Sequence, residues 1–214
     1  MNYITLGKVG YGRYEEKHSV FLGMAMPVFT EEEAIEAIKA VRSEYPDARH
    51  TVYAYRLREG ARVRYSDDRE PSGTAGVPIL DILTKNEYEN CLVTVTRYFG
   101  GILLGTGGLV RAYTETAQRA ISDAGAVQKQ LLSLFSFSCD YGDYGRFEKL
   151  LTDQRVAIDG VDFTDKVTLS YAVPADSVER IHALLREASA GRLAPLALGE
   201  AYRNVEIGEK TKKI

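Results

Sequence analysis

A polar segment of the chain carries three carboxylates within four positions, at Asp67, Asp68 and Glu70. Carboxylate oxygens at this spacing could bind a divalent cation or supply a general base. The spacing does not fit an EF-hand loop, and Arg69 among the acids weakens their negative field. Two interpretations therefore stay open, a site that uses these carboxylates and a turn that they anchor by pairing with nearby arginines.

The second candidate site is a glycine-rich segment between the strand-like run 93–99 and a helical pattern over 109–124. A strand, a glycine-rich loop and a helix together direct free backbone N–H groups toward one point, which favours a phosphate or carboxylate. The spacing matches neither a Walker A loop nor a dinucleotide fingerprint. We expect Thr106 to cap the helix. The alternative is that the glycines only permit close packing; they are Gly100, Gly101, Gly105, Gly107 and Gly108.

Cationic and aromatic residues flank the glycines on both sides. Arg97 precedes them and Arg111 follows one turn into the helix, and both are possible partners of Asp68 and Glu70 in the turn interpretation. The aromatic residues could stack on nucleic-acid bases or lie buried in the core. They are Tyr98, Phe99 and Tyr113.

Basic residues cluster in a predicted hairpin that spans 50–57 and 62–65. Such a cluster is typical of a charged sheet edge that resists aggregation. It would equally suit a surface that faces phosphate groups or RNA. We treat it as a secondary part of the candidate surface, with members His50, Arg56, Arg58, Arg62 and Arg64.

Other catalytic chemistries find little support in the sequence. The three histidines are scattered, so no zinc site is expected, and we predict neither a metal nor another cofactor. Ser72 lacks a nucleophile elbow and a Ser-His-Asp order. Ser72 and Thr74 are therefore included only as members of the candidate binding surface.

The composition is that of an ordinary globular protein. Of its 214 residues, 45% are hydrophobic and 27% charged, and the net charge is −3, so nucleic-acid binding would need a local basic patch. Two distant cysteines, Cys91 and Cys139, are expected to be buried thiols. Because the sequence shows neither a signal peptide nor a membrane span, we expect a cytoplasmic protein without membrane contact.

Element patterns predict two α+β domains, 1–126 and 127–214. In the first, strands are expected over 3–9 and 14–28 with a turn at Gly10, Tyr11 and Gly12, and a helix follows the capping residue Thr30. In the second, the order is βαββαβ, which is the ferredoxin-like pattern, with a last strand over 197–207 and a frayed end at 209–214.

Two long motifs carry a family resemblance. The segments DDREPSGTAG (67–76) and VTRYFGGILLGTGGLVRAY (95–113) resemble the signature of the Impact/YigZ family. The resemblance covers roughly residues 15–125, and the remainder looks like the second domain of bacterial members. Arg69 stands where the family usually carries glycine, so its effect on the turn is open.

The resemblance implies an N-terminal domain similar to domain IV of elongation factor G and to a small-subunit ribosomal protein domain. The C-terminal domain would resemble another ferredoxin-like part of that factor. Eukaryotic Impact proteins restrain a starvation-responsive translation kinase by binding its activator. Some bacterial members carry a proline-dipeptidase label, which the lack of a metal-ligand constellation does not support.

Together these observations lead us to expect a non-catalytic, translation-linked protein that binds RNA or a ribosome-associated protein. The expected surface combines the 100–108 loop, Arg97, Arg111 and the 66–74 segment, with the basic hairpin nearby. The alternative is a small-molecule enzyme, a hydrolase or one acting on a phosphorylated ligand, that uses Asp67, Asp68 or Glu70. A third possibility is protein–protein binding alone. The oligomeric state is left open.

Overall fold

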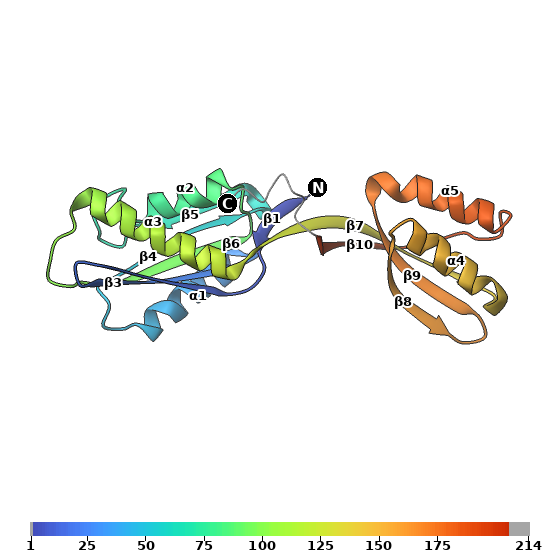
Figure 1. Ribbon diagram of the computed structural model, residues 1–214, viewed down its shortest axis with the longest axis horizontal. Helices are drawn as coiled ribbons and strands as arrows, with labels where there is room; N and C mark the ends of the chain where they lie inside the picture. The colour runs from blue at the N-terminus through green and yellow to red at the C-terminus, as the bar shows by residue number, and fades with distance from the viewer. Residues whose placement is uncertain (1, 206–214) are drawn as a thin grey trace. The chain divides into compact units, whose positions relative to one another are not determined.

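A computed structural model of the chain describes residues 2–205. Their contacts divide into two compact units, one of residues 3–128 and one of residues 129–204 (Figure 1). Both units mix helices with an antiparallel sheet, which confirms the predicted two-domain α+β fold. The predicted boundary, between residues 126 and 127, falls inside strand β7 (Ala126–Cys139).

The first unit is built on a five-stranded antiparallel sheet with a helix on one face and two on the other (Figure 1). The strands lie in the order β2 (Gly10–Glu16), β3 (Ser19–Pro27), β6 (Cys91–Tyr98), β4 (His50–Leu57) and β5 (Arg62–Ser66). The helices are α1 (Glu31–Glu44) on one face and α2 (Gly76–Lys85) and α3 (Gly105–Ala124) on the other. A short strand, β1 (Tyr3–Leu6), and a 3-10 turn, η1 (Glu59–Ala61), complete the unit.

Alternation along the strands produces a core on each face of this sheet. Val93 and Val95 of β6 face α2 and α3, in the larger core, whereas Leu92 faces α1. The Thr30 cap of α1 is confirmed, because Glu33 N donates to Thr30 Oγ1 at 3.1 Å. The buried face of β6 continues to Arg97, a charged residue in an otherwise apolar row.

The predicted turn at Gly10, Tyr11 and Gly12 is wrong, because these residues begin β2. Residues 10 and 12 are glycine because helix α3 crosses the strand closely: a Cβ on Gly10 would lie 2.1 Å from the backbone nitrogen of Ala124. The chain instead reverses after β2 at Lys17 and His18, both of which have positive φ. Here glycine marks a close approach of backbones rather than a turn.

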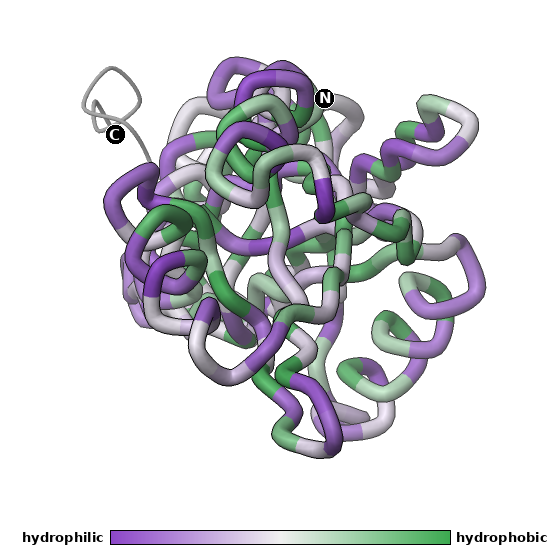
Figure 2. The backbone as a smooth tube through the Cα atoms, turned by 90° about the vertical axis from the view of Figure 1, so that its right-hand side faces the viewer, coloured by the Kyte–Doolittle hydropathy of each residue, from purple (hydrophilic) through white to green (hydrophobic). Residues whose placement is uncertain are grey.

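The second unit has the predicted βαββαβ order. Its strands lie in the order β10 (Leu196–Val205), β7, β9 (Val167–Pro174) and β8 (Ala157–Phe163), the 4-1-3-2 order of a ferredoxin-like fold. Helices α4 (Tyr141–Asp153) and α5 (Val178–Ala188) pack on one face, and η2 (Ala175–Ser177) precedes α5. Hydrophilic and hydrophobic residues alternate along the helical turns in Figure 2. The predicted positions 206–214 lie outside the described residues.

Two further expectations concern the whole chain. Cys91 and Cys139 are both free and buried, as predicted. Between residues 2 and 205, no helix has the length and hydropathy needed to cross a bilayer.

Candidate functional site

The register of the first sheet brings two distant motifs together at one end of the sheet. In the β4–β6 pair His50 lies opposite Arg97, and in the β3–β6 pair Phe21 lies opposite Arg97. All three side chains therefore share the face covered by α3. His50, a secondary candidate in the sequence, is thus a direct neighbour of the glycine-rich motif.

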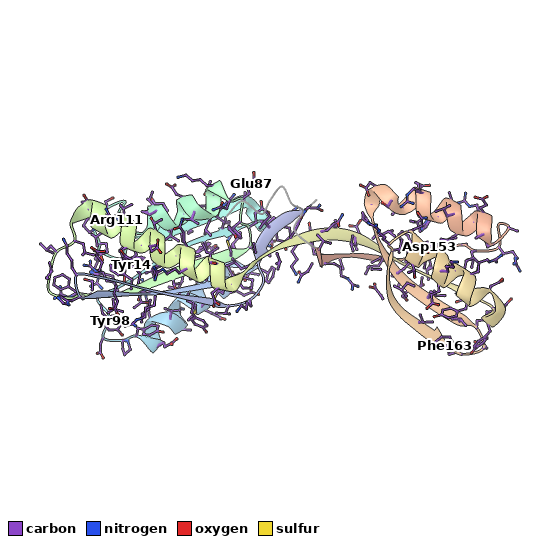
Figure 3. The ribbon with its side chains drawn as sticks, viewed as in Figure 1. Tyr14, Glu87, Tyr98, Arg111, Asp153 and Phe163 are labelled. Atoms are coloured by element: carbon purple, nitrogen blue, oxygen red, sulfur yellow. The ribbon has the colours of Figure 1, made fainter. Side chains whose placement is uncertain are left out.

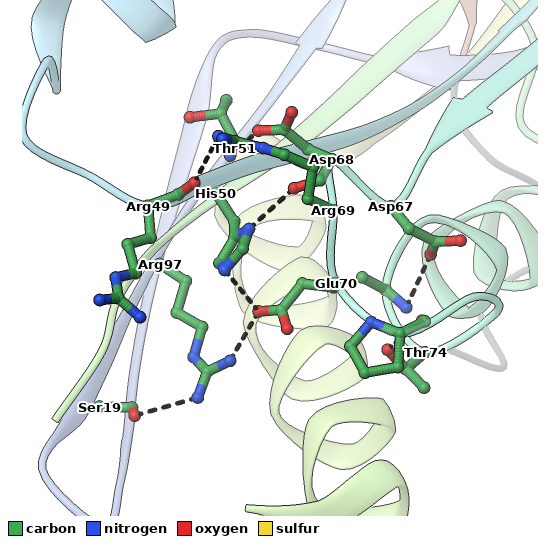
Figure 4. A network of polar contacts seen from close by, with 12 residues as sticks. Ser19, Arg49, His50, Thr51, Asp67, Asp68, Arg69, Glu70, Thr74 and Arg97 are labelled. Atoms are coloured by element: carbon green, nitrogen blue, oxygen red, sulfur yellow. Dashed lines mark hydrogen bonds and ion pairs between the residues drawn. The ribbon is translucent and has the colours of Figure 1, made fainter. Parts of the chain in front are cut away.

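Glu70 is the centre of a buried polar network on this face (Figure 4). Its Oε1 accepts hydrogen bonds from Arg97 at 2.6 Å and from the Tyr113 hydroxyl at 2.7 Å, and lies 3.9 Å from His50 Nε2. The side chains of Arg97 and Glu70 are only 6% and 4% exposed. A buried carboxylate is tolerated because a cation and further hydrogen bonds compensate its lost hydration.

Tyr113 supports this network from α3. Burial, and then the neighbouring Glu70, raise the pKa of the Tyr113 hydroxyl, so it stays protonated and donates a hydrogen bond to the carboxylate. The ring also packs edge-on against Phe21, with centroids 5.1 Å apart. Tyr113 is fully buried, so it cannot stack on a base from solvent, and of the two expectations for this ring burial is the correct one.

Asp67 and Asp68 stabilise the turn that positions Glu70. Asp67 accepts from the backbone nitrogens of Gly73, Ala75 and Gly76 at 2.8–3.1 Å. Asp68 accepts from the backbone nitrogen of Thr51 at 2.8 Å and lies 3.4 Å from Arg42.

The predicted turn interpretation therefore holds in part. Glu70 pairs with Arg97, whereas Asp68 pairs with Arg42 rather than with Arg97 or Arg111. Thr74 is also engaged, since its hydroxyl donates to the carbonyl of Pro71 at 2.7 Å, while Ser72 is exposed. In the part of the chain that the structure describes, no cluster of three His, Cys, Asp or Glu side chains could hold a metal.

Arg69 occupies a backbone position that suits glycine. Its φ is +71°, and that of Asp68 is +41°, both in the left-handed region. Non-glycine residues are strained there. The Arg69 guanidinium donates to the carbonyl of Arg49 at 3.0 Å.

Glycine occupies the positions of the second motif for different structural reasons. Gly100 packs tightly, because a Cβ there would lie 2.0 Å from the carbonyl carbon of His18. Gly101 and Gly105 have positive φ, and beside them, as at Gly107, an added Cβ would meet no atom within 4 Å. Close packing therefore explains Gly100 but not these other three.

Helix α3 starts earlier than predicted. It begins at Gly105 after the N-cap residue Leu104, which offers no side-chain hydrogen bond. Thr106 is consequently in the first helical turn and is not the cap. An uncapped helix start leaves backbone N–H groups directed at the loop side, where the helix dipole is positive.

A pocket of about 310 Å³ joins the two motifs. Its walls contain the buried network, the aromatic and aliphatic residues of the loop, and the start of α3. The lining residues are Arg49, His50, Glu70, Pro71, Arg97, Phe99, Leu103, Leu104, Gly105, Thr106 and Leu109. We call this the Glu70 pocket. Phe99 is 37% exposed, and the guanidinium carbons of Arg49 and Arg97 each lie 5.5 Å from its ring centroid.

Some predicted site residues lie elsewhere. Tyr98 follows Arg97 along β6, so its side chain points to the opposite face of the sheet, toward α1 (Figure 3). Arg111 is exposed on α3, near the pocket in sequence but outside its lining (Figure 3). Neither Gly107 nor Gly108 lines the pocket, although both belong to the first turns of the same helix.

Of the basic hairpin only His50 lines the pocket, and its four arginines do not, contrary to expectation. Arg56 pairs in register with Cys91, at the other end of β6 from Arg97, about 20 Å along the strand at 3.3 Å per residue. Its cations also have partners: Arg58 lies 3.5 Å from Glu89, and Arg62 pairs with Glu31. Arg56 donates to the carbonyl of Leu83, and Arg64 to that of Val63.

Several lining residues escaped the sequence reasoning. Arg49 lines the pocket, but in the sequence it is only one more basic residue just before the predicted hairpin. Ser19 lies outside the lining, and nothing in the sequence indicates that its hydroxyl accepts from Gly100 N at 3.1 Å. The apolar residues Leu103, Leu104 and Leu109 follow the glycines directly and could have been noticed. The register that joins Arg49 to them is a tertiary feature, which no local pattern reveals.

Comparisons with known proteins identify the family. Residues 17–121 match the model of the Impact N-terminal domain, and residues 137–192 match a domain of unknown function, DUF1949. The IMPACT family member YigZ of Escherichia coli (strain K12) is 36% identical over 189 residues, covering 87% of this chain and 93% of that protein. The chain belongs to the IMPACT family.

Two more similarities extend across both units. IMPACT family member YvyE of Bacillus subtilis (strain 168) is 34% identical over 167 residues, 78% of this chain and 77% of that protein. A solved structure, described as the crystal structure of a hypothetical protein, shares 34% sequence identity with a TM-score of 0.59. That match covers 92% of this chain and 97% of the solved one. The resemblance of the two signature motifs to the IMPACT family is thereby confirmed.

Proposed function

We propose that this IMPACT family member is a non-catalytic, translation-linked protein that binds ribosomal RNA at the mouth of the Glu70 pocket. The observation that carries the proposal is that the acids of this region are bonded within the chain, whereas two of its arginines have no ion-pair partner among residues 2–205. Asp67, Asp68 and Glu70 are each held by backbone N–H groups or arginines. By contrast, Arg49 and Arg111 are exposed, and neither has an ion-pair partner among residues 2–205.

Because the whole chain has a net charge of −3, an RNA-binding surface on it requires a local excess of positive charge, which Arg49 and Arg111 would supply. Free arginines attract phosphates, and an exposed aromatic ring such as Phe99 offers a stacking surface. The uncapped start of α3 adds backbone donors of the kind that bind phosphate. Arg49, Phe99 and the start of α3 line the same pocket, and Arg111 lies on that helix, outside the lining.

Family membership supports the link to translation. The resemblance given above implies that eukaryotic Impact proteins restrain a translation kinase by binding its activator, and that the domains resemble parts of an elongation factor. Fold similarity is a weaker argument than a site. The charge distribution at the pocket therefore carries more weight here.

The enzyme alternative has less support. A general base or metal ligand needs a carboxylate that is available to a substrate, and all three acids already accept hydrogen bonds from this chain. Glu70 reaches the pocket wall, but its Oε1 is shared by Arg97 and Tyr113. We therefore assign these carboxylates a structural role.

The proposal is tested by cosedimentation with purified ribosomes. Wild-type protein is compared with the Arg49→Ala/Arg111→Ala variant at low and at high salt. Arg97 is unsuitable as a test position, because its removal would leave Glu70 buried without a cation. The control is Lys85→Ala/Arg146→Ala, which removes the same charge from exposed positions outside the pocket.

We expect wild type and control to sediment with ribosomes at low salt and to be released at high salt. The Arg49→Ala/Arg111→Ala variant should stay in the supernatant at both. Equal sedimentation of all three proteins would contradict the proposed surface. Absence of the wild-type protein from the ribosome pellet at low salt would contradict the function.

A further inference from the structure

We propose that the Glu70 pocket binds a phosphate monoester, with the phosphate at the start of α3 and the remainder of the ligand against the apolar wall. If the ligand is the 5′ end of an RNA chain, the inference rests on the proposed function. The other source is a free nucleotide. Both present the same chemical group, so the test below separates them.

The helix start supplies the first set of donors. Gly105 and Thr106 line the pocket. Their backbone N–H groups lie in the first turn of a 20-residue helix, where N–H groups have no acceptor within the helix. The N-cap residue, Leu104, has no side chain that could satisfy them. Phosphate groups bind such helix starts because the donors converge and the dipole is favourable.

A second, independent observation concerns Arg97, which also lines the pocket. Arg97 is 5% exposed, and its Nε has no hydrogen-bond acceptor among residues 2–205, although its other nitrogens contact Glu70 and Ser19. A buried guanidinium donor without an acceptor is uncommon in a folded protein. It is accounted for if the acceptor is a ligand in the pocket that Arg97 lines.

The charge of the pocket also favours an anion. Glu70 is the only acid among the described residues of its lining, and its Oε1 already accepts from Arg97 and from the Tyr113 hydroxyl. Arg49 remains as a cation without an ion-pair partner within the described range. A phosphate monoester has three terminal oxygens, which can accept from the helix start, Arg49 and the Arg97 side at once.

The size and the apolar wall define the rest of the ligand. A volume of about 310 Å³ lies at the small end of the range for ligand pockets, so it fits one compact molecule or one chain end. Phe99, Leu103 and Leu109 form an apolar side next to the polar one. A nucleoside monophosphate has this division, with a charged group at one end and a flat ring at the other.

Thr106 provides a pair of variants for the test. It is exposed in the first turn of α3 and lines the pocket. In Thr106→Glu the added carboxylate interacts favourably with the helix dipole and competes with the phosphate. Thr106→Gln has nearly the same shape without the charge, so loss of binding in Thr106→Glu alone cannot result from bulk or unfolding.

The experiment measures binding of adenosine 5′-monophosphate and of adenosine to the full chain by calorimetry, with thermal shift as a second readout. We expect the monophosphate to bind and to raise the melting temperature in proportion to the logarithm of its concentration, and adenosine to bind at least about tenfold more weakly. Thr106→Gln should retain this preference, and Thr106→Glu should lose it. Equal binding of the two compounds, or of the two variants, would overturn the inference.

A second arm identifies the source of the ligand. One RNA hexamer is prepared with a 5′-phosphate and with a 5′-hydroxyl group. Preferential binding of the phosphorylated hexamer supports the end of an RNA chain, and binding of the monophosphate without such preference supports a free nucleotide. Ribosome cosedimentation of the same variants keeps the two proposals separate. If ribosomes bind wild type while both adenosine compounds bind equally, only this inference fails; if the monophosphate binds and ribosomes do not, only the proposed function fails.

Discussion

Arg97 and Glu70 form an ion pair of 2.6 Å whose two side chains are 6% and 4% exposed. The pair joins the two signature motifs, because Arg97 is the last residue but one of β6, before the glycine-rich loop, and Glu70 follows the two aspartates of the acidic turn. It therefore fixes the position of both walls of the Glu70 pocket. A charged residue in each motif thus has a structural reason that does not depend on catalysis.

The first prediction concerns the stability of this pair. Arg97→Ala should lower the free energy of unfolding by about 3–5 kcal/mol, because it leaves the Glu70 carboxylate buried without its cation. Urea unfolding followed by circular dichroism measures the loss. Arg111→Ala, at an exposed position on α3, should change stability by no more than about 0.5 kcal/mol.

The double variant provides a sharper check of the same prediction. Glu70→Ala/Arg97→Ala should cost clearly less than the sum of the two single variants, because no charge remains unpaired. Additive costs would show that the two residues do not depend on one another, contrary to the structure.

The second prediction uses the left-handed backbone at Arg69, whose φ is +71°. Arg69→Gly should leave the free energy of unfolding unchanged or raise it by up to about 1 kcal/mol, because glycine relieves the strain. Arg69→Val should lower it by more than about 1 kcal/mol, since a β-branched residue is disfavoured there. Thermal unfolding of the three proteins decides the matter, and a Val variant as stable as wild type would refute the assigned conformation.

The third prediction distinguishes two glycines of the same motif. Gly100→Ala should destabilise the protein by about 1–3 kcal/mol, because the new Cβ would lie 2.0 Å from the backbone of His18. Gly107→Ala should be neutral or stabilise by up to about 1 kcal/mol, since a Cβ there meets no atom within 4 Å and alanine favours helix. Chemical unfolding of both variants is the measurement. Equal costs would contradict the described packing of the loop.

The fourth prediction concerns alkaline pH. Burial raises the pKa of the Cys91 thiol from its ordinary 9.0 to about 12. Above about pH 9 the unfolded chain therefore releases this proton while the folded chain keeps it, so stability falls as pH rises, by about 1.4 kcal/mol per pH unit for this group. The stabilisation is fully present below pH 9.

Urea unfolding between about pH 8 and pH 10.5 measures the slope. Cys91→Ala should be less stable than wild type below about pH 9, because it leaves a small cavity in the core. Its decline with pH should nevertheless be shallower, since the titrating thiol is gone. Parallel curves would show that Cys91 is not the group responsible.

The sequence predicted the fold class and the family but not the construction of the site. Helix α1 and its Thr30 cap, and the βαββαβ order of the second unit, follow from local patterns that repeat over many residues. The two signature motifs were recognisable because they are long. Local patterns also misled at Gly10 and Gly12, where the reason for glycine is the distant helix α3.

The pocket could not be predicted because it depends on strand register. Nothing near Arg49 in the chain indicates that it lies beside Phe99, fifty residues later, at a distance of 5.5 Å from the ring. The same register moves Arg56 to the far end of the sheet, although six residues separate it from His50. Pairing between strands is specified by side-chain fit across the whole core, which one segment does not contain.

The central claim is that Arg49, in the lining of the Glu70 pocket, and Arg111, on the helix that starts there, bind RNA phosphates. Its most direct test is the affinity for single-stranded RNA, measured by fluorescence anisotropy between about 50 and 200 mM salt. Each lost phosphate contact lowers the slope of log affinity against log salt by about 0.7. The account predicts a slope about 1.4 smaller for Arg49→Ala/Arg111→Ala than for wild type and an unchanged slope for Lys85→Ala/Arg146→Ala. Identical slopes for all three proteins, or no binding by wild type at about 50 mM salt, would contradict it.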